Sequence, residues 1–427
     1  MTVDSGRPDG AGGDYFSDES IATDTYPYFD FLLRGRRVWR EPYHGVVMVA
    51  GHEEVLAVMR DTASFSNCNI VAGPNFAFPV ELTGDDVTDL VAAHRDELPM
   101  GDQIIAFDPP KHTAHRALLM GLITPKRLKE NEEFMWGLAD RQLDQVLPAG
   151  QCEFIDEFAQ PYTLLVIADL LGVPESDHPQ LLRRADIGRR LVDETGEDSG
   201  VPHHPLDFLY GYFSDRIEEL RNEPQGDVLT GMARAKFPDG STPEPVDVAR
   251  IAANLFSAGK ETTVRLLSTA LRLICDEPGL QQRLREHREL IPRFIEETLR
   301  LESPIKGAFR LALKTTTVGG VEIPAGSNVM LLHGATGRDP RQFECPHELR
   351  IDRPNVRQHI SFGAGIHTCP GAPLARAEGR VVIERLFDRT HEIRVSESAH
   401  GPADARRYEY LPTYMIHGLR QLNLEFD

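Results

Sequence analysis

Apolar residues recur every three or four positions through most of this 427-residue chain, and this periodicity predicts a mainly helical protein. The longest helical pattern runs from about Val246 to Asp276. Shorter ones cover Pro125 to Leu147, Tyr162 to Leu171 and Ala372 to Phe387. Because a helix with one apolar face buries that face against its neighbours, we expect these segments to form the body of the fold.

Short strand-like segments lie between the helices. Val46 to Val49 is a continuous apolar run typical of a buried strand, and Cys152 to Phe158 is a second strand-like segment. Thr317 to Val321 contains paired glycines, which are typical of a hairpin turn. Tyr410 to Phe426 predicts further paired strands. The predicted fold class is therefore mainly α with small β-sheets.

Three segments lack a sustained periodic pattern. Residues 1–25 begin with a polar, glycine-rich stretch, so we expect them to be disordered or loosely attached and residues 26–427 to form a single domain. Residues 67–107 are apolar without a clear period, and loops of this length are usually functional or mobile. Residues 193–205 are polar and predict a surface loop.

Composition and charge narrow the possible functions. The chain is 41% hydrophobic, and its net charge of −20 argues against nucleic acid as a partner. No apolar run approaches the length needed to cross a bilayer, and no basic-then-apolar leader is present, so we expect a cytoplasmic protein. The five cysteines are scattered and odd in number, which is not typical of a disulfide framework or a zinc site.

The most informative segment is Phe362 to Gly371, where one cysteine lies between glycines and a Pro-Gly pair. Glycine permits backbone angles and close approaches that a side chain would prevent. Pro370 suits the start of a following helix, so we expect Cys369 at a helix N-terminus, where thiolate is favoured over thiol. The pattern therefore indicates a metal ligand, and the alternative is a buried structural cysteine.

This decapeptide resembles the haem-binding loop of the cytochrome P450 family, Phe-Gly-x-Gly-x-His-x-Cys-x-Gly, and carries all six of its specified residues. The resemblance covers nearly the whole chain from about residue 25 and implies the cytochrome P450 fold. It also implies a haem b cofactor, iron protoporphyrin IX, with Cys369 as the metal ligand. The loop residues expected to bind the haem are Phe362, Gly363, His367, Cys369 and Gly371.

Residues 258–263, Ala-Gly-Lys-Glu-Thr-Thr, place a glycine, an acid and two hydroxyls inside the longest apolar helix, which lowers helix stability and suggests a site. The segment resembles the oxygen-activating Ala-Gly-x-Glu/Asp-Thr motif of the family. The resemblance implies that Ala258 and Gly259 lie beside the haem, with Gly259 leaving room above the iron. It also implies that Glu261 and Thr262 deliver protons to bound dioxygen. The alternative is a helix kink with a surface glutamate.

The segment Asp108-Pro109-Pro110 predicts a helix start with Asp108 as the capping carboxylate. His112 and Arg116 then share one face of that helix, four residues apart. This pattern resembles the family segment that binds a haem propionate. Arg310 matches the second propionate ligand of the family.

Glu297 and Arg300 lie three residues apart on a predicted helix and can form an ion pair, which contributes only about 0.3–0.5 kcal/mol when exposed. A buried pair needs a further partner. The resemblance supplies Arg353 as that partner and implies a structural role for all three residues.

The expected substrate is hydrophobic, because the candidate pocket residues are mostly apolar. Lys306 is the only cation besides Arg310 in the segment 305–310. It could meet a substrate carboxylate or, as we expect, point into solvent. By resemblance, the substrate-binding residues are Phe76, Phe78, Ile305, Ala308 and Thr413.

The resemblance implies a monooxygenase that inserts one oxygen atom from O2 into a C–H bond of a terpenoid, steroid, fatty acid or aromatic compound. No flavin or nicotinamide domain is apparent, since Gly363-Ala364-Gly365 has Thr368 where a dinucleotide-binding loop has a third glycine. We therefore expect a ferredoxin and its NAD(P)H-dependent reductase as partners. Arg376 and Arg380 could form part of a basic docking surface or a solvated helix face.

Three alternatives remain open from the sequence. A peroxide-dependent haem-thiolate hydroxylase would not need the Glu261-Thr262 pair. A haem-binding sensor would bind the cofactor without turnover. A cysteine hydrolase would use His367 as the base for Cys369.

Overall fold

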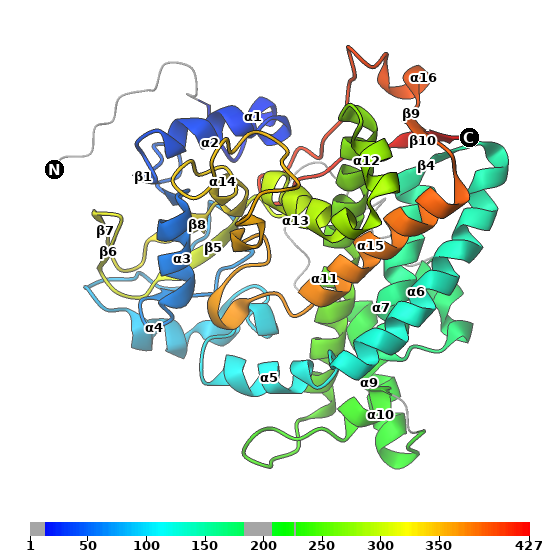
Figure 1. Ribbon diagram of the computed structural model, residues 1–427. Coiled ribbons are helices and arrows are strands. Elements are labelled where there is room, and N and C mark those ends of the chain that lie inside the picture. The colour runs from blue at the N-terminus through cyan, green and yellow to red at the C-terminus, as the bar shows by residue number, and fades with distance from the viewer. Residues whose placement is uncertain (1–12, 183–206, 226–227) are drawn as a thin grey trace. The chain divides into compact units, whose positions relative to one another are not determined.

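The structure is a computed structural model that describes residues 13–182, 207–225 and 228–427 (Figure 1). The predicted polar loop at 193–205 lies outside these residues. The chain forms two compact units, each assembled from three separate stretches. Unit 1 contains the chain up to Pro109, Glu289–Cys369 and Tyr408–Arg420, and unit 2 contains Pro110–Arg288, Pro370–Arg407 and Gln421–Asp427.

A five-stranded sheet organises unit 1, with the strand order β1-β2-β8-β5-β3. The β2 and β8 strands are parallel, with Val47 opposite Val329, and the remaining pairs are antiparallel. The predicted buried strand at 46–49 is confirmed as β2. The strands are β1 (Val38–Arg40), β2 (Val47–Val49), β3 (Phe65–Ser66), β5 (Ala308–Ala312) and β8 (Asn328–Leu331).

The helices of unit 1 are short, apart from the one that carries the predicted Glu297 cluster. A separate hairpin of β6 (Thr316–Val318) and β7 (Val321–Ile323) confirms the predicted turn, where Gly319 and Gly320 have φ angles of 56° and 80°. The helices are α1 (Glu19–Thr23), α2 (Tyr26–Leu33), α3 (His52–Arg60), α4 (Thr88–Ala93), α13 (Ile291–Leu301) and α14 (His333–Thr336).

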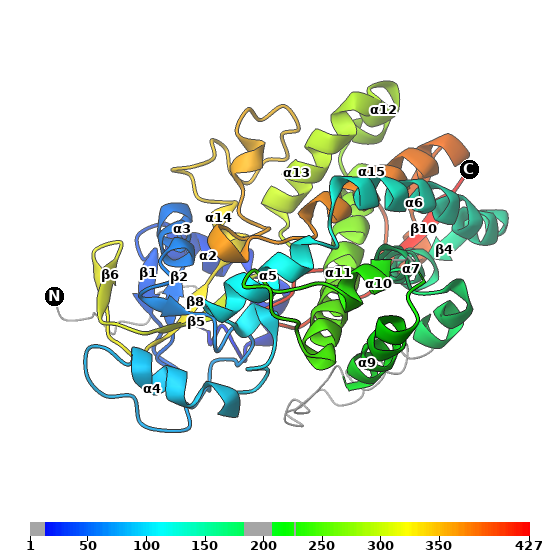
Figure 2. The same ribbon diagram turned by 90° about the horizontal axis from the view of Figure 1, so that it is seen from below.

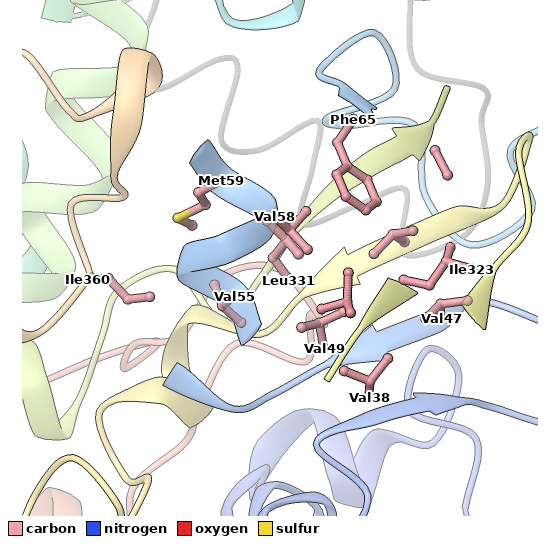
Figure 3. Close-up of a cluster of buried hydrophobic side chains, with 13 residues drawn as sticks. Val38, Val47, Val49, Val55, Val58, Met59, Phe65, Ile323, Leu331 and Ile360 are labelled. Atoms are coloured by element: carbon pink, nitrogen blue, oxygen red, sulfur yellow. The ribbon is translucent and has the colours of Figure 1, made fainter. Parts of the chain in front are cut away.

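One core of unit 1 lies between α3 and the sheet (Figure 3). Val55 and Val58 of α3 pack with strand residues such as Val49, and Met59 belongs to the same cluster on the side of α3 where Ile360 lies. The spacing of the three α3 residues is the helical spacing that places side chains on one face. Ile360, from the segment just before the cysteine loop, packs into the same core, so this loop is anchored to the sheet side of the unit.

Residues 13–25 are packed more tightly than the sequence suggests. Tyr15 is 2% exposed, and its hydroxyl donates a hydrogen bond to the Tyr414 carbonyl at 3.1 Å. Its ring lies against Tyr28 and Phe29. Any loosely attached segment therefore ends before residue 13, and residues 1–12 lie outside the described part of the chain.

The segment 67–107 also contains more structure than its irregular pattern indicates. Besides α4, it forms single 3₁₀ turns at Arg95–Glu97 and Ile104–Ala106. Val87, Val91 and Leu98 pack with β5 residue Leu311 in a buried cluster. Packing against the sheet therefore orders a segment whose own periodicity is weak.

Unit 2 is a helical assembly in which α11 packs against α7, α9 and α15, while α6 packs against α7 and α15 (Figures 1 and 2). The predicted long helices are confirmed. No helix within the described ranges has the length and apolar character needed to cross a membrane. The helices are α5 (Lys111–Met120), α6 (Pro125–Val146), α7 (Gln160–Leu171), α9 (Asp207–Asn222), α10 (Val228–Ala233), α11 (Pro245–Asp276), α12 (Leu280–Glu286), α15 (Ala372–Arg389) and α16 (Glu397–His400).

A small antiparallel sheet completes unit 2, with β10 (Asn423–Phe426) between β4 (Gln151–Glu153) and β9 (Ile393–Val395). The predicted strand at 152–158 is only partly correct. Residues 155–159 form a π-helical turn that runs into α7. The buried residues Ile155, Phe158 and Tyr162 follow helical rather than alternating spacing, which explains the change.

Candidate functional site

The cysteine loop closes on itself in unit 1. The Cys369 amide donates a hydrogen bond to the Phe362 carbonyl at 2.8 Å, and the Gly363 amide donates to the Ile360 carbonyl at 2.8 Å. Gly363 and Gly365 both have a φ of 70°, where a side chain would be strained. The glycines thus allow the tight path that the sequence predicts.

Gly365 is required for a second reason, because the loop passes very close to α3. A Cβ atom on Gly365 would lie 2.8 Å from the Met59 carbonyl oxygen. Such a distance would force the backbone to move, so only glycine fits here. The half-buried Cys369 is therefore presented by a loop that both α3 and its own hydrogen bonds hold in place.

The predicted position of Cys369 at a helix N-terminus needs correction. Helix α15 begins at Ala372 with Gly371 as its N-cap, so Cys369 precedes the cap by two residues. Helix-dipole effects fall off within the first turn. The tight loop rather than the helix end is therefore the local feature that presents the sulfur.

Arg310 gives unit 1 a buried positive charge. The side chain is buried in β5, and desolvation lowers its pKa to about 10, although Asp108 opposes this shift. Its guanidinium donates to the Phe309 carbonyl at 2.6 Å, and within the part of the chain that the structure describes no carboxylate lies within ion-pair distance of it. Because a buried charge without a counter-charge is expensive, Arg310 fits an anionic ligand group such as a haem propionate.

His333 lies in the electrostatic field of Arg310 and was not predicted from the sequence. Both ring nitrogens are buried, and neither has a hydrogen-bond partner among the described residues. Desolvation and the Arg310 charge lower the pKa of His333 to about 3, so the imidazole is neutral. The sequence does contain a sign of this residue, because His333 directly follows the apolar run of residues 329–332, most of which forms β8.

The three predicted structural residues come together in unit 1. Glu297 accepts from Arg300 through both carboxylate oxygens, at 2.7 Å each, and from Arg353 Nε at 3.2 Å. All three side chains are at most 2% exposed. The Arg300 guanidinium also donates to the Gly337 and Pro346 carbonyls. The cluster is thus a fully hydrogen-bonded buried ion network, as such burial requires.

The middle of α11 in unit 2 has an open face. Apart from the partly exposed Arg250, the helix is buried from Val248 to Phe256 and from Thr263 to Leu271, whereas residues 257–258 are exposed and residues 259–262 are partly exposed. Residues four apart share one face of a helix, so Ala258 and Thr262 border the same opening. The Thr262 hydroxyl donates to the Ala258 carbonyl at 3.0 Å.

Two contacts in this segment go beyond the motif. The carboxylate of Glu261 accepts from Nε of Arg265 at 2.8 Å, one turn along the helix. A Cβ atom on Gly259 would lie 3.3 Å from Ile167 on α7, so this glycine serves the close packing of α11 on α7. Its place above an iron remains a prediction. The contact with Arg265 could have been predicted from the sequence, because Glu261 and Arg265 lie four residues apart on a predicted helix.

His112 and Arg116 lie four residues apart on α5, which packs against α11 in unit 2. His112 is buried and Arg116 is partly exposed. The predicted capping role of Asp108 is wrong. Pro110 is the N-cap residue of α5, and no side chain accepts a hydrogen bond from the first backbone N–H groups of this helix as a cap. Asp108 instead accepts from the Asn67 amide at 3.0 Å and pairs with Arg95. Its carboxylate therefore holds the 66–108 segment of unit 1 together.

The predicted substrate residues all lie in unit 1. Phe76 and Phe78 pack edge to face, with ring centroids 6.3 Å apart, on the cluster around Leu311. Ala308 is buried at the start of β5, and Ile305 forms a bridge with Ile416. The Thr413 hydroxyl accepts from the Ile416 amide at 2.9 Å and so closes its own turn.

The expectation for Lys306 is wrong. Its side chain is 2% exposed, and the ammonium donates to the Thr413 carbonyl at 2.7 Å and to the Ala22 carbonyl. Desolvation lowers its pKa to about 8. Lys306 therefore fastens the C-terminal turn to the N-terminal helix instead of pointing into solvent.

Arg380, from the predicted basic surface, is paired within unit 2, as are two arginines further along α15. Arg380 bonds Glu132 at 2.5 Å, Arg385 lies 3.4 Å from Asp140, and Arg389 bonds Asp144 at 2.7 Å. All three acids belong to α6. Much of the positive charge of α15 is thus compensated locally, although each pair remains partly exposed.

The structure also contains a cavity of about 660 Å³ in unit 2. It lies among α5, α6, α7 and α10, and its lining includes Arg127, Asp169 and Met232. None of the predicted site residues borders it. Arg127 is already engaged there by the carbonyls of Asp169 and Leu170.

Comparison with known proteins identifies the family. Cytochrome P450 144 of Mycobacterium tuberculosis is 31% identical over 416 residues, which are 96% of this chain and 90% of the relative. The chain belongs to the cytochrome P450 family. The family model described as "Cytochrome P450" matches residues 179–390.

Solved P450 structures share the fold. Mycobacterium marinum cytochrome P450 CYP150A6, in its substrate-free form, is 52% identical with a TM-score of 0.91, covering 97% of this chain and 98% of the other. CYP109E1 from Bacillus megaterium, in complex with testosterone, is 27% identical with a TM-score of 0.77, covering 94% and 99%. The fold class is therefore the cytochrome P450 fold, mainly α with small sheets.

As a P450, the protein is a monooxygenase with a haem-thiolate cofactor, and it uses O2, an organic substrate and a redox partner. Membership does not support the sensor and cysteine-hydrolase alternatives. The chemistry of the residues present in unit 1 fits the cofactor, because this unit supplies both a loop cysteine and a buried cation without an ion-pair partner among the described residues.

Proposed function

We propose that this P450 inserts one oxygen atom from O2 into a C–H bond of a hydrophobic small molecule, using electrons from a ferredoxin and its NAD(P)H-dependent reductase. The observation that carries the proposal is the open face of α11, where Ala258 and Thr262 belong to an exposed or partly exposed stretch, residues 257–262, between two buried ones. A face of this kind leaves room for a reacting ligand beside a hydroxyl and an acid. The cofactor in this proposal is haem b.

The residues would divide the work of holding the haem. Cys369 would supply the thiolate ligand, and Arg310 would pair with one propionate. His112, Arg116 and His367 are proposed to hold the propionates as well. The remaining proposed cofactor contacts are Ala258, Gly259, Phe362, Gly363 and Gly371. The bound haem supplies O2 activation and electron transfer.

Proton delivery is proposed for Thr262 and Glu261. Because the Thr262 hydroxyl donates its hydrogen to the Ala258 carbonyl, its oxygen lone pairs are left to accept a proton from another donor. Glu261 is partly exposed and can exchange protons with solvent. A carboxyl and a hydroxyl on adjacent residues therefore offer a short route from water to the open face.

The substrate class rests on pocket chemistry and on relatives. Phe76, Phe78, Ile305, Ala308 and Thr413 are proposed to contact the substrate, and four of them are apolar. CYP109E1 has been solved with testosterone and with corticosterone, and P450BioI with a hexadec-9Z-enoic acid ligated acyl carrier protein. We therefore place steroids and fatty acids first, with terpenoids and aromatic compounds as further candidates.

The test is a spectral titration of the purified, haem-loaded protein with testosterone, a long-chain fatty acid, a monoterpenoid and an aromatic compound. A high-spin shift confined to one class would identify the substrate type. Turnover with NAD(P)H, ferredoxin and reductase should then place labelled oxygen from O2 in the product. Product formed only with hydrogen peroxide would favour the peroxide-dependent alternative, and failure to bind haem would overturn the proposal.

A further inference from the structure

A buried pair of side chains links α13 to the segment that enters the cysteine loop. The Nε2 atom of His359 lies 2.9 Å from Oε2 of Glu296, and the two side chains are 2% and 3% exposed. Arg357, which is 79% exposed, lies 3.9 Å from the other carboxylate oxygen. None of the P450 motifs in the sequence contains either residue of this pair.

The hydrogen bonds of His359 bear on the tautomer of its imidazole ring. The Ser361 amide lies 3.3 Å from Nδ1 and can only donate, so Nδ1 must accept. A neutral imidazole that accepts at Nδ1 carries its proton on Nε2, and that proton is donated to Glu296. The pair therefore holds the imidazole in one orientation, with a hydrogen bond at each ring nitrogen.

The same segment leads directly to the cysteine. The Ser361 hydroxyl donates to the Leu299 carbonyl of α13 at 2.7 Å, and the His359 ring lies 6.0 Å from the Phe362 ring. Phe362 in turn provides the carbonyl that accepts the Cys369 amide at 2.8 Å. All of these contacts lie within unit 1.

Glu296 and its neighbour Glu297 divide two tasks. Successive residues on a helix point about 100° apart. Glu297 faces Arg300 and Arg353, whereas Glu296 faces His359. One turn of α13 thus holds both the buried ion network and the entry to the cysteine loop.

We infer that Glu296 and His359 are positioning residues for Cys369, which fix the Phe362 carbonyl and through it the place of the sulfur. This inference rests on the proposed role of Cys369 as the haem ligand. Groups that orient a metal ligand through hydrogen bonds tune the metal and its retention, and their loss typically costs about 10-fold to 100-fold in metal affinity or activity.

The experiment compares His359→Gln with His417→Gln in the haem-loaded protein. His417 is the matched control, because it also forms a buried pair with a glutamate next to α13, at 2.7 Å from Glu302, and none of its contacts with described residues involves the cysteine loop. The readouts are the haem reduction potential, the thiolate band of the ferrous carbonyl complex, and haem transfer to a haem-free acceptor protein. We expect His359→Gln to speed haem loss about 10-fold and to shift the potential, with His417→Gln near wild type.

Glu296→Gln is the second variant, in case His359→Gln does not fold. Its amide oxygen can still accept from Nε2, so the thiolate band should remain while the potential shifts less than in His359→Gln. Equal effects of the His359 and His417 variants, or no effect of either, would overturn the inference. A wild-type protein without a thiolate band would instead refute the role of Cys369 itself.

Discussion

Glu261 and Arg265 are joined one turn apart on α11, where two guanidinium nitrogens donate to a single carboxylate oxygen of Glu261. The Arg265 side chain is 8% exposed, whereas that of Glu261 is 38% exposed. A buried guanidinium therefore holds a carboxylate that reaches solvent. The proposed proton donor depends on a residue outside its own motif.

We expect Glu261→Gln to lower the rate of product formation by about 100-fold, the lower end of the usual range for a general acid–base group. Arg265→Gln should lower it less and should add nothing in the Glu261→Gln background, because Arg265 acts only through Glu261. Arg272→Gln is the matched control, since Arg272 pairs with Asp276 at i,i+4 on the same helix. Independent losses in the double variant would contradict the coupling.

Thr262 offers a direct test of the open face. Thr262→Val keeps the shape but removes the hydroxyl, so we expect electrons to be diverted into hydrogen peroxide, while Thr262→Ser keeps the coupling. The measurement is the ratio of peroxide to organic product for each NAD(P)H consumed. Equal coupling in the valine and serine variants would place the proton route elsewhere.

The lowered pKa of Lys306 leads us to expect that the stability of the fold depends on pH. Its folded pKa of about 8 lies below the ordinary 10.5, so the unfolded chain binds the proton more tightly between these values. Stability therefore rises with pH through this window, by about 3 kcal/mol in total. Urea unfolding of wild type against Lys306→Met at pH 7.5 and 10 should show the difference. Lys314→Met, at a half-exposed lysine, retains Lys306 and should keep the wild-type rise.

For Glu378 we expect stability to change with pH in the opposite direction. It is 1% exposed on α15, its Oε2 has no hydrogen-bond partner among the described residues, and burial raises its pKa well above 4.5. The folded state therefore binds the proton more tightly, and stability falls as pH rises above 4.5.

We expect Glu378→Gln to remove this loss. The variant should gain on wild type by about 1.4 kcal/mol per pH unit above 4.5, until the folded pKa is passed. Denaturant unfolding between pH 5 and pH 8 measures it, with Glu384→Gln as the partly exposed control on the same helix. A constant difference across this range would mean that Glu378 is ionised in the folded protein.

Variants of Arg380 can distinguish an effect on ferredoxin docking from an effect on stability. Because it pairs with Glu132, Arg380→Glu would both reverse a surface charge and break a contact between α6 and α15. We expect ferredoxin-supported turnover to fall about 10-fold at low salt, since charge complementarity governs association rates. The swap Glu132→Arg with Arg380→Glu restores an ion pair but not the charge at 380. Full recovery in the swap would show that the pair, not docking, was responsible.

The sequence predicted those features whose physical cause is local. The periodicity of α6, α7, α11 and α15 and the glycines of the cysteine loop each report on a few neighbouring residues. Glu297 and Arg300 belong to this class because they lie on one helix turn. Only the family resemblance, and no spacing rule, could supply Arg353 as their partner.

The misses involve partners far apart in the chain. Lys306 bonds a carbonyl 284 residues away, and Glu296 bonds His359 across 63 residues. Asp108 has the spacing of a helix cap, yet its carboxylate is taken by Asn67 and Arg95 once the 66–108 segment folds back. Tertiary contacts determine the partners of these side chains, and a pattern within a few neighbouring residues carries no information on such contacts.

The interleaving of the two units along the chain has a consequence for synthesis. Residues 408–420 belong to unit 1, while β10 is the central strand of the unit 2 sheet. Both units thus lack part of their structure until these residues are available. On the ribosome, unit 1 cannot reach its final packing before residue 420 has left the exit tunnel, and unit 2 cannot do so before residue 426 has left it.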